Sequence, residues 1–346
     1  MGSHTLSVQR NWGRGHRAVK RGLIVGKFYP PHRGHQFLIE TALAQVDHLD
    51  VLICARPDQT ISGELRKQWL EEIHPFAHVR VIDDPGEDDN SEFWAKFTVQ
   101  VLGYAPDVVF TSEDYGDAFA RHLGCRHVMV DRERLQVPIS ARAIRDVPLR
   151  HWEYLEPCVR AYFVKRICVV GAESTGKTTL ARDLANHYQT TSVPEYGREY
   201  CEKLQAQGVD LWTYQWRSEE FVEIARRQEE LENRMAREAN RVLICDTDVL
   251  STGIWHERYL GRKSPEVEAI AASQRHDLYL LTGCDIPFVQ DGLRDGESIR
   301  EWMTARFEES LQRRFAWVKL PGGHELRLKS AIREVGRFLE EPDFAR

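Results

Sequence analysis

The sequence has no long apolar run, since none of its hydrophobic stretches approaches the roughly 20 residues that a membrane-spanning helix needs. Its N-terminus also lacks the charged-then-apolar pattern of a secretory signal. Cysteine is scarce: the seven cysteines lie far apart and form no Cys-x-x-Cys pair, which argues against a zinc site or a disulfide framework. These absences predict a cytoplasmic protein with reduced thiols.

An excess of basic charge is missing as well. The 53 acidic residues outnumber the 47 basic ones, and the net charge is −6. The whole chain therefore carries no electrostatic footprint for nucleic acid or for an anionic membrane surface. Residues 1–21 are a local exception because they are polar and basic. We expect them to form a flexible leader, and the alternative is a nucleic-acid-binding arm.

What the sequence does contain is a regular alternation of strand-like and helix-like segments. At 346 residues, 42% of them hydrophobic and 29% charged, the chain can bury a core in each of two domains. Alternation of this kind predicts an α/β fold with two doubly wound parallel sheets. We expect one domain at 22–146, a helical connector at 147–164 and a second domain at 165–346.

The segment "GAESTGKTT" at 171–179 matches the P-loop pattern G-x-x-x-x-G-K-[ST], and it lies between a strand-like and a helix-like run. In such a loop the glycines let backbone N–H groups surround phosphates. Lys177 then reaches the β- and γ-phosphates, and the Thr178 hydroxyl ligates Mg²⁺. We predict that ATP or GTP binds here. The predicted nucleotide-binding residues are Gly171, Glu173, Ser174, Thr175, Gly176, Thr178 and Thr179.

A kinase also needs a metal ligand, a base and a cover for the transferring group. Asp246 ends the apolar run "VLICD" and is the predicted Mg²⁺ ligand. Glu195 in "VPEYGREY" is the candidate base, with Asp246 as its rival, although Glu195 could instead pair with Arg198 and cap the next helix. Arg294, on a glycine-containing loop, is the candidate for stabilising the transferred phosphoryl group, and Arg300 is the weaker alternative.

Three tryptophans, Trp212, Trp216 and Trp255, are candidates for stacking on a heterocyclic acceptor. Tryptophans pack in cores at least as often, so each has that alternative role. We assign Trp255 to substrate binding.

The segment "GKFYPPHRGH" at 26–35 places two histidines around a glycine at a strand-to-helix turn. His35 begins the helix, so the backbone N–H groups there and His32 can face one anion together. Imidazoles suit this role because they donate hydrogen bonds and can carry charge near neutral pH. The residues by themselves predict a phosphate-binding turn.

The pattern His32-x-Gly34-His35 resembles the H-x-G-H signature of the nucleotidyltransferase superfamily, which includes the nicotinamide mononucleotide (NMN) adenylyltransferases. The segment "ISARAIR" at 139–145 resembles their second signature, I-S-x-T-x-x-R, except that Arg142 replaces the threonine. The resemblance assigns His32 and His35 to catalysis. It assigns nucleotide binding to Gly26, Lys27, Phe28, Gly34, Ser140 and Arg145.

A nucleotidyltransferase followed by a P-loop kinase is similar to the NadR-type bifunctional NAD-salvage enzymes, and the matching motifs cover about 22–320. The resemblance implies that the C-terminal domain phosphorylates nicotinamide riboside to NMN with ATP. The N-terminal domain would then convert NMN and ATP to NAD and pyrophosphate. Some members carry an N-terminal helix-turn-helix repressor domain, for which the residues before 22 leave no room, so we expect no nucleic-acid partner.

The resemblance also implies a mechanism in which the NMN phosphate attacks the α-phosphorus of ATP in line, with no protein nucleophile and with Mg²⁺ offsetting charge. Trp94 resembles an aromatic residue that stacks on nicotinamide, and core packing is its alternative. The expected partners are ATP, nicotinamide riboside, NMN and NAD, with no membrane. The sequence leaves homo-oligomerisation open.

Two alternatives remain at this point. One is the adenylyltransferase–kinase fusion of coenzyme A synthesis, and the other is a regulator that senses ATP and NAD with weak turnover. "GAESTGKTT" and "EYGREY" favour the nicotinamide acceptor, and Lys177, His32 and His35 argue for retained catalysis. Motif spacing does not identify the acceptor.

Overall fold

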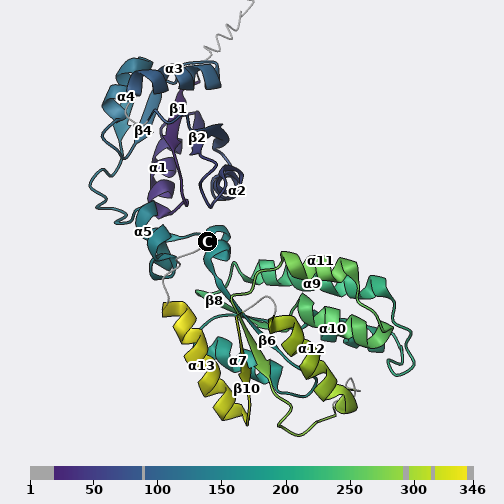
Figure 1. The fold of residues 1–346 in the computed structure, drawn as a ribbon. Coiled ribbons are helices and arrows are strands. Elements are labelled where there is room, and N and C mark those ends of the chain that lie inside the picture. Colours follow the sequence, from purple (N-terminus) through teal and green to yellow (C-terminus); the bar gives the residue numbers. More distant parts are fainter. Residues whose placement is uncertain (1–18, 88–89, 291–295, 313–315, 341–346) are drawn as a thin grey trace, which may run out of the picture. The chain divides into compact units, whose positions relative to one another are not determined.

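The computed structural model describes residues 19–87, 90–290, 296–312 and 316–340. The chain divides into two compact units, with the boundary between Ile139 and Ser140. Each unit is built on one five-stranded parallel sheet with helices on both faces, which confirms the predicted α/β class (Figure 1). Within the described residues, no helix is both long and apolar enough to cross a membrane.

The first unit alternates strands and helices from its start. Its elements are β1 (Arg21–Gly26), α1 (Arg33–Leu43), β2 (His48–Ala55), α2 (Gly63–Ile73), β3 (His78–Asp83), α3 (Ser91–Leu102), β4 (Val108–Thr111), α4 (Gly116–Leu123) and β5 (Arg126–Met129). The strand order is β3-β2-β1-β4-β5, and every pairing is parallel. The order reverses between β1 and β4, so the crevice for a ligand lies at the carboxyl ends of these two strands.

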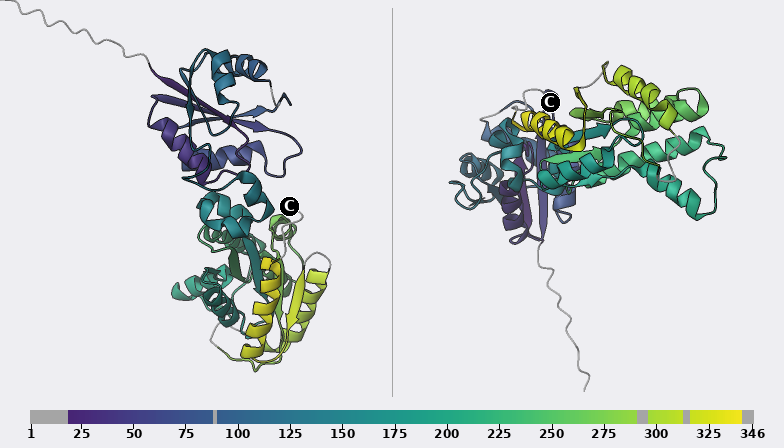
Figure 2. Two further views of the ribbon diagram at one scale, coloured as in Figure 1. Left: turned by 90° about the vertical axis from the view of Figure 1, so that its left-hand side faces the viewer. Right: turned by 90° about the horizontal axis from the view of Figure 1, so that it is seen from below.

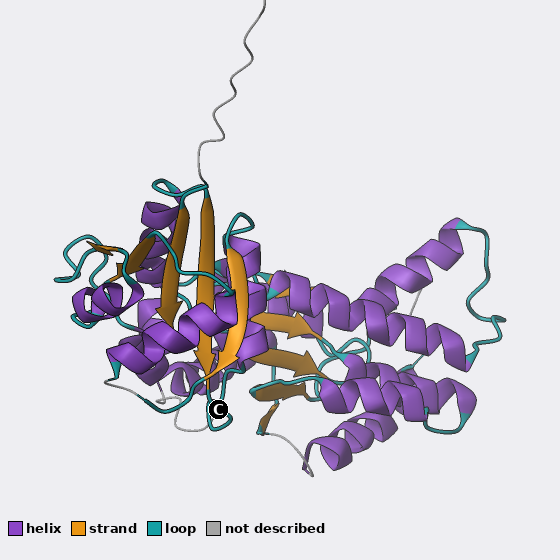
Figure 3. Ribbon diagram, turned by 90° about the horizontal axis from the view of Figure 1, so that it is seen from above, coloured by secondary structure: helices purple, strands orange, loops and turns teal. Residues whose placement is uncertain are grey.

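Helices cover both faces of this sheet (Figure 3). Ile24 and Val51 face a core that includes Leu38 and Ile39 of α1. Side chains of the opposite parity, such as Leu23, face the core formed with α3 and α4. Burial on both faces explains why the strands are continuous apolar runs and not alternating ones.

The second unit begins with short helices. They are α5 (Ala141–Asp146), the 3₁₀ helix η1 (Pro148–Tyr154) and α6 (Pro157–Phe163). The elements that follow are β6 (Lys165–Val170), α7 (Lys177–His187), β7 (Ser192–Val193), α8 (Tyr196–Ala206), α9 (Ser218–Met235), β8 (Val242–Asp246), α10 (Val249–Leu260), α11 (Pro265–Ser273), β9 (Leu278–Thr282), η2 (Glu297–Ile299), α12 (Arg300–Gln312), β10 (Trp317–Leu320) and α13 (His324–Glu340).

The sheet of this unit has the parallel order β10-β9-β6-β8-β7, with β6 in the centre. Leu180 of α7 and Ala331 of α13 pack against Ile167 on one face of the sheet, and α9 and α10 lie toward the other face (Figure 2). Because parallel strands end at the same edge, the segments that follow β6, β7 and β8 meet there. This geometry brings together the P-loop, Glu195 and Asp246.

Candidate functional site

The P-loop of the second unit joins β6 to α7 and depends on two glycines. Gly171 has φ 145° and Gly176 has φ 81°, which are conformations that L-residues with a side chain rarely adopt. A Cβ atom on Gly171 would also lie 2.4 Å from the Thr282 hydroxyl oxygen. These glycine conformations let the loop turn so that its backbone N–H groups lie beside the N-terminus of α7. Together they form a site that suits an anion.

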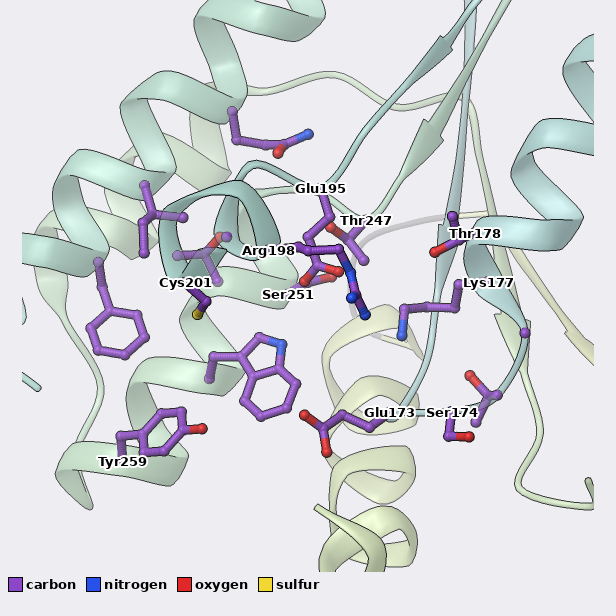
Figure 4. Close-up of a pocket in the computed structure, with 18 of the residues that line it drawn as sticks. Glu173, Ser174, Lys177, Thr178, Glu195, Arg198, Cys201, Thr247, Ser251 and Tyr259 are labelled. Atoms are coloured by element: carbon purple, nitrogen blue, oxygen red, sulfur yellow. The ribbon is translucent and has the colours of Figure 1, made fainter. Parts of the chain in front are cut away.

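Lys177, the first residue of α7, folds back over this loop. Its ammonium donates a hydrogen bond to the Ala172 carbonyl at 2.9 Å. In Figure 4 the ammonium of Lys177 and the guanidinium of Arg198 point into the same space, while the Glu173 side chain extends from the P-loop toward it. Arg198 lies one helical turn beyond Glu195, and the sequence indicated it only as a partner of that residue.

Two carboxylates face these cations. Glu195 occupies the N-cap position of α8, but its side chain makes no capping hydrogen bond. Burial raises the pKa of Glu195, and the charge of Asp246 raises it further, while Lys177 opposes the shift. Burial also raises the pKa of Asp246, again opposed by Lys177 and by a hydrogen bond from Thr178. A carboxylate with a raised pKa accepts a proton well near neutral pH.

Asp246 has a second feature, an unused ligand atom. The residue is 5% exposed, and its Oδ1 atom has no hydrogen-bond partner within the described residues. Together with the Thr178 hydroxyl it supplies the hard oxygen ligands that Mg²⁺ prefers. These residues therefore fit the expected cation.

A pocket extends from the P-loop toward α9 and α10. Besides P-loop residues 173–179, its lining residues are Glu195, Gly197, Arg198, Cys201, Trp216, Phe221, Ile224, Gln228, Thr247, Ser251, Thr252, Trp255 and Tyr259. The end away from the P-loop is aromatic: the rings of Trp255 and Tyr259 lie 6.0 Å apart at 21°. Trp212 is not among the lining residues and is 62% exposed. The pocket thus offers cations at one end and aromatic rings at the other.

Two buried arginines hold the P-loop from its outer side. Arg327, 2% exposed, donates to the carbonyls of Thr175 and Gly283. Arg300, 8% exposed, donates to the carbonyls of Ser174 at 3.3 Å and Ile286 at 3.0 Å. Both arginines therefore bind loop carbonyls and leave the amide side of the loop open. Arg294, the predicted cover of the phosphoryl group, lies outside the described residues.

The turn between β1 and α1 in the first unit brings three rings together. The ring centroids of His32 and His35 lie 3.8 Å apart, and that of Phe28 lies 4.9 Å from His35. His32 is the N-cap of α1, because its Nδ1 atom accepts the Gly34 N–H at 3.0 Å. Gly26 ends β1 just before this cluster.

The electrostatics of the turn define the protonation state of both imidazoles. Burial, aided by the charge of Arg134, lowers the pKa of His32 to about 3. Burial and the neighbouring His32 lower the pKa of His35 well below its usual value. His32 is thus neutral at pH 7, and since Nδ1 accepts a hydrogen bond, the proton resides on Nε2. The turn therefore presents two neutral imidazoles, which can donate N–H hydrogen bonds to a phosphate but carry no charge.

This state predicts an acid-sensitive first unit. The unfolded chain takes up a proton at His32 near pH 6.5, whereas the folded chain does so only near pH 3, so stability falls as the pH drops below 6.5. Between pH 7 and pH 5, the variant His32→Asn, which retains an N-cap acceptor, should lose about 1–2 kcal/mol less unfolding free energy than the wild type. Urea unfolding, monitored through the hydrogen exchange of α1, measures this difference in unfolding free energy. Equal losses in both proteins would contradict the assigned protonation state.

A fully buried arginine supports this turn. Arg66 of α2 is 0% exposed and donates to the carbonyls of Lys27, Cys54 (3.3 Å) and Ser62 (3.2 Å). It thereby links the segment after β1 to the end of β2 and the start of α2. The side chain of Lys27 itself is exposed. No local motif marks Arg66, because its acceptors lie in three separate segments.

The remaining predicted residues have identifiable local roles. Trp94 on α3 donates its indole N–H to the Glu87 carbonyl at 2.8 Å and packs on the core of the first unit, in line with its alternative role. Ser140 is the N-cap of α5 and accepts the Ala143 N–H at 3.2 Å. Arg145 lies in the last turn of the same helix. Both residues belong to the second unit.

The sequence of this chain is similar to those of several known proteins. The model of a family described as an AAA domain matches residues 166–327. The trifunctional NAD biosynthesis/regulator protein NadR of Escherichia coli K12 is 33% identical over 305 residues, covering 80% of this chain and 72% of that protein. A nicotinamide-nucleotide adenylyltransferase of Pyrobaculum neutrophilum is 30% identical over 167 residues, covering 43% of this chain and 89% of its own.

A crystal structure of NadR protein in complex with NR shares the fold. It covers 93% of this chain and 97% of its own, with a TM-score of 0.78 and 21% sequence identity. The sequence identity to the Escherichia coli protein, over most of both chains, shows which family this chain belongs to. The chain belongs to the NadR family, and it is an enzyme of NAD biosynthesis.

Proposed function

We propose that the protein makes NAD in two steps. The second unit transfers the γ-phosphoryl group of ATP to nicotinamide riboside, and the first unit joins the resulting NMN to ATP, giving NAD and pyrophosphate. The pocket of the second unit carries the proposal, because it presents cations beside a P-loop at one end and aromatic rings at the other. The NR complex of a NadR protein and the adenylyltransferase relative support the same two activities.

In the kinase step the 5′-hydroxyl of the riboside attacks the γ-phosphorus. The new P–O bond forms as the bond to the β–γ bridging oxygen breaks, and the hydroxyl proton passes to Glu195. We assign the base to Glu195 because the unpartnered Oδ1 of Asp246 suits a cation. Lys177 and Arg198 stabilise the charge on the phosphoryl oxygens. Mg²⁺ held by Asp246 and Thr178 would neutralise phosphate charge. A role for Arg294 over the transferring group stays a prediction from the sequence.

In the adenylyl transfer the NMN phosphate attacks the α-phosphorus of ATP, and pyrophosphate leaves. The nucleophile is already an anion, so the protein needs to align the reactants and stabilise charge without providing a base. His32 would donate from Nε2 to a phosphate oxygen, with His35 beside it at the N-terminus of α1. The role of Lys27, Ser140 and Arg145 along the triphosphate stays a prediction from the sequence.

The identity of the kinase acceptor has a direct test. The protein is incubated with ATP and Mg²⁺ plus either nicotinamide riboside or dephospho-coenzyme A, and the products are separated by chromatography. We expect ADP and NMN with the riboside and no phosphorylation of dephospho-coenzyme A. Turnover of dephospho-coenzyme A alone would favour the coenzyme A fusion instead. Binding of ATP and NAD without turnover would favour the sensing regulator.

Gly34 provides a test of the turn in the first unit. A Cβ atom at this position would lie 2.9 Å from Cε1 and 3.0 Å from Nδ1 of His32, so Gly34→Ala must displace that imidazole. We expect NAD formation from NMN to fall by about 10²-fold or more, because small misplacement of aligning groups has effects of that size. Riboside phosphorylation by the same variant should be unchanged. Full retention of NAD formation would show that the ring position is unimportant.

A further inference from the structure

A chain of buried polar side chains runs behind the pocket of the second unit. The Tyr279 hydroxyl donates to Asp248 at 2.7 Å and lies 3.0 Å from Nδ1 of His276. Nε2 of His276 lies 3.1 Å from a carboxylate oxygen of Glu232, whose other oxygen accepts from the Gln228 amide at 3.4 Å. All five residues are at most 8% exposed. We call these five residues the hydrogen-bond chain.

Each end of the hydrogen-bond chain reaches a segment that carries a candidate catalytic group. At one end, the side-chain amide oxygen of Gln228 accepts a hydrogen bond from the backbone N–H of Tyr196 at 2.8 Å. Tyr196 directly follows Glu195. At the other end, Asp248 is the N-cap of α10 and lies two residues after Asp246. The hydrogen-bond chain therefore connects the start of α8 to the start of α10 through residues of α9 and β9.

The charged side chains of the hydrogen-bond chain lie beside groups of opposite charge within the protein. The Glu232 carboxylate lies between His276 and the Arg166 guanidinium, which is 3.8 Å away. His276 lies between Glu232 and Asp248, whose carboxylate is 3.7 Å from Nδ1. Apolar side chains of similar volume often give equal stability in such places. Fully satisfied polar networks, in contrast, fix one geometry, which is what an active site needs.

The same region offers donor atoms for a metal, but they are already engaged. Cys168 with Asp248 and His276, and Cys245 with Glu232 and His276, each gather ligand atoms within 4.8 Å of one another. Both ring nitrogens of His276 face a hydrogen-bond partner, Glu232 at Nε2 and Tyr279 at Nδ1. A cation would have to break these bonds, so the geometry favours the hydrogen-bond chain.

We propose that the hydrogen-bond chain, through Gln228 and Glu232, consists of positioning residues that set the separation of Glu195 and Asp246 for phosphoryl transfer. The inference rests on the proposed kinase function of the second unit. Its consequence is that breaking the chain lowers kcat of the kinase and leaves ATP binding intact, because the P-loop and Lys177 take no part in it.

The test removes hydrogen bonds from the hydrogen-bond chain and then restores them with donor and acceptor side chains exchanged. Gln228→Met removes both hydrogen bonds at similar length. The double variant Gln228→Glu with Glu232→Gln restores them, because the new carboxylate accepts from Tyr196 and the new amide donates to it while accepting from His276. Val222→Ala, a shortened apolar side chain on the same helix, controls for loss of packing. The NAD-forming activity of each purified full-length variant serves as the internal control.

We expect Gln228→Met to lower kcat for riboside phosphorylation about tenfold or more, with KM for ATP within about twofold of the wild type. The double variant should recover to within about threefold, and Val222→Ala should match the wild type. Because Gln228 also lines the pocket, a double variant as impaired as Gln228→Met would show direct substrate contact and overturn the inference. An unchanged kcat in Gln228→Met would overturn it too. Absence of riboside phosphorylation by the wild type would refute the proposed function instead.

Discussion

Lys177→Ala should reduce kcat for phosphorylation of nicotinamide riboside by about 10²–10³-fold, the range expected when one preorganised charge at a reacting oxygen is removed. The ammonium lies over the P-loop, 2.9 Å from the Ala172 carbonyl, where the transferring phosphate would sit. Its removal also takes away one of the two cations, with Arg198, that oppose the rise in pKa of Glu195 and Asp246. A further rise in pKa leaves more of both carboxyl groups protonated, and a protonated carboxyl group neither accepts the hydroxyl proton nor binds a cation. Both losses slow the same step.

The measurement is NMN formation from the riboside at saturating ATP. Lys203→Ala is the matched control, because this exposed lysine on α8 forms a salt bridge with Glu199 at 2.6 Å and does not line the pocket. The control should retain wild-type activity, and NAD formation from added NMN should be normal in both variants. If Lys177→Ala lost NAD formation from NMN to the same degree, the assignment of separate sites would be wrong.

His35→Ala should give the opposite pattern, a loss of about 10²–10³-fold in NAD formation from NMN with normal riboside phosphorylation. The centroid of the His35 imidazole lies 3.8 Å from that of His32 and 4.9 Å from that of the Phe28 ring. Its Nδ1 atom is buried and has no hydrogen-bond partner among the described residues, which marks it as a group available to a ligand.

Pyrophosphate release with NMN and ATP measures this effect. His122→Ala, at an exposed position on α4 of the same unit, is the control and should have no effect. Thermal unfolding of both variants separates a missing contact from a loss of folding. A folded His35→Ala variant with wild-type adenylyl transfer would remove this turn from the mechanism.

Contiguous motifs explain how much of the site the sequence could predict. The P-loop and the H-x-G-H turn are local, since their geometry depends on glycine conformations and on a helix start within about ten residues. The strand-end positions of Glu195 and Asp246 follow from the alternation of strands and helices, because parallel strands deliver their ends to one edge. The fold class was predictable for the same reason, and the structure and its relatives confirm it.

Residues that act over long distances in the chain were not predictable. Arg327 holds the P-loop from a helix 152 residues beyond its acceptor, and Arg66 acts 39 residues from Lys27. Gln228 was not predictable either, because the partners of a glutamine on a buried helix face are known only once the chain has folded. Spacing also gave no means to separate the exposed Trp212 from Trp216 and Trp255 of the pocket.

Two of the predictions concern residues beyond the described part of the chain. The leader at 1–21 is described only from residue 19, and Arg294 lies in the undescribed segment 291–295. Both stay predictions from the sequence. The kinetics of Arg294→Ala would show whether this arginine contributes to phosphoryl transfer.

The most direct test of the account is a time course with nicotinamide riboside labelled in its nicotinamide ring, together with ATP, Mg²⁺ and the wild-type protein. Chromatography follows the label, ADP and pyrophosphate. We expect the label to pass first into NMN, with one ADP formed, and then into NAD, with one pyrophosphate formed. Label that stays in the riboside, with added NMN also left unconverted, would contradict it.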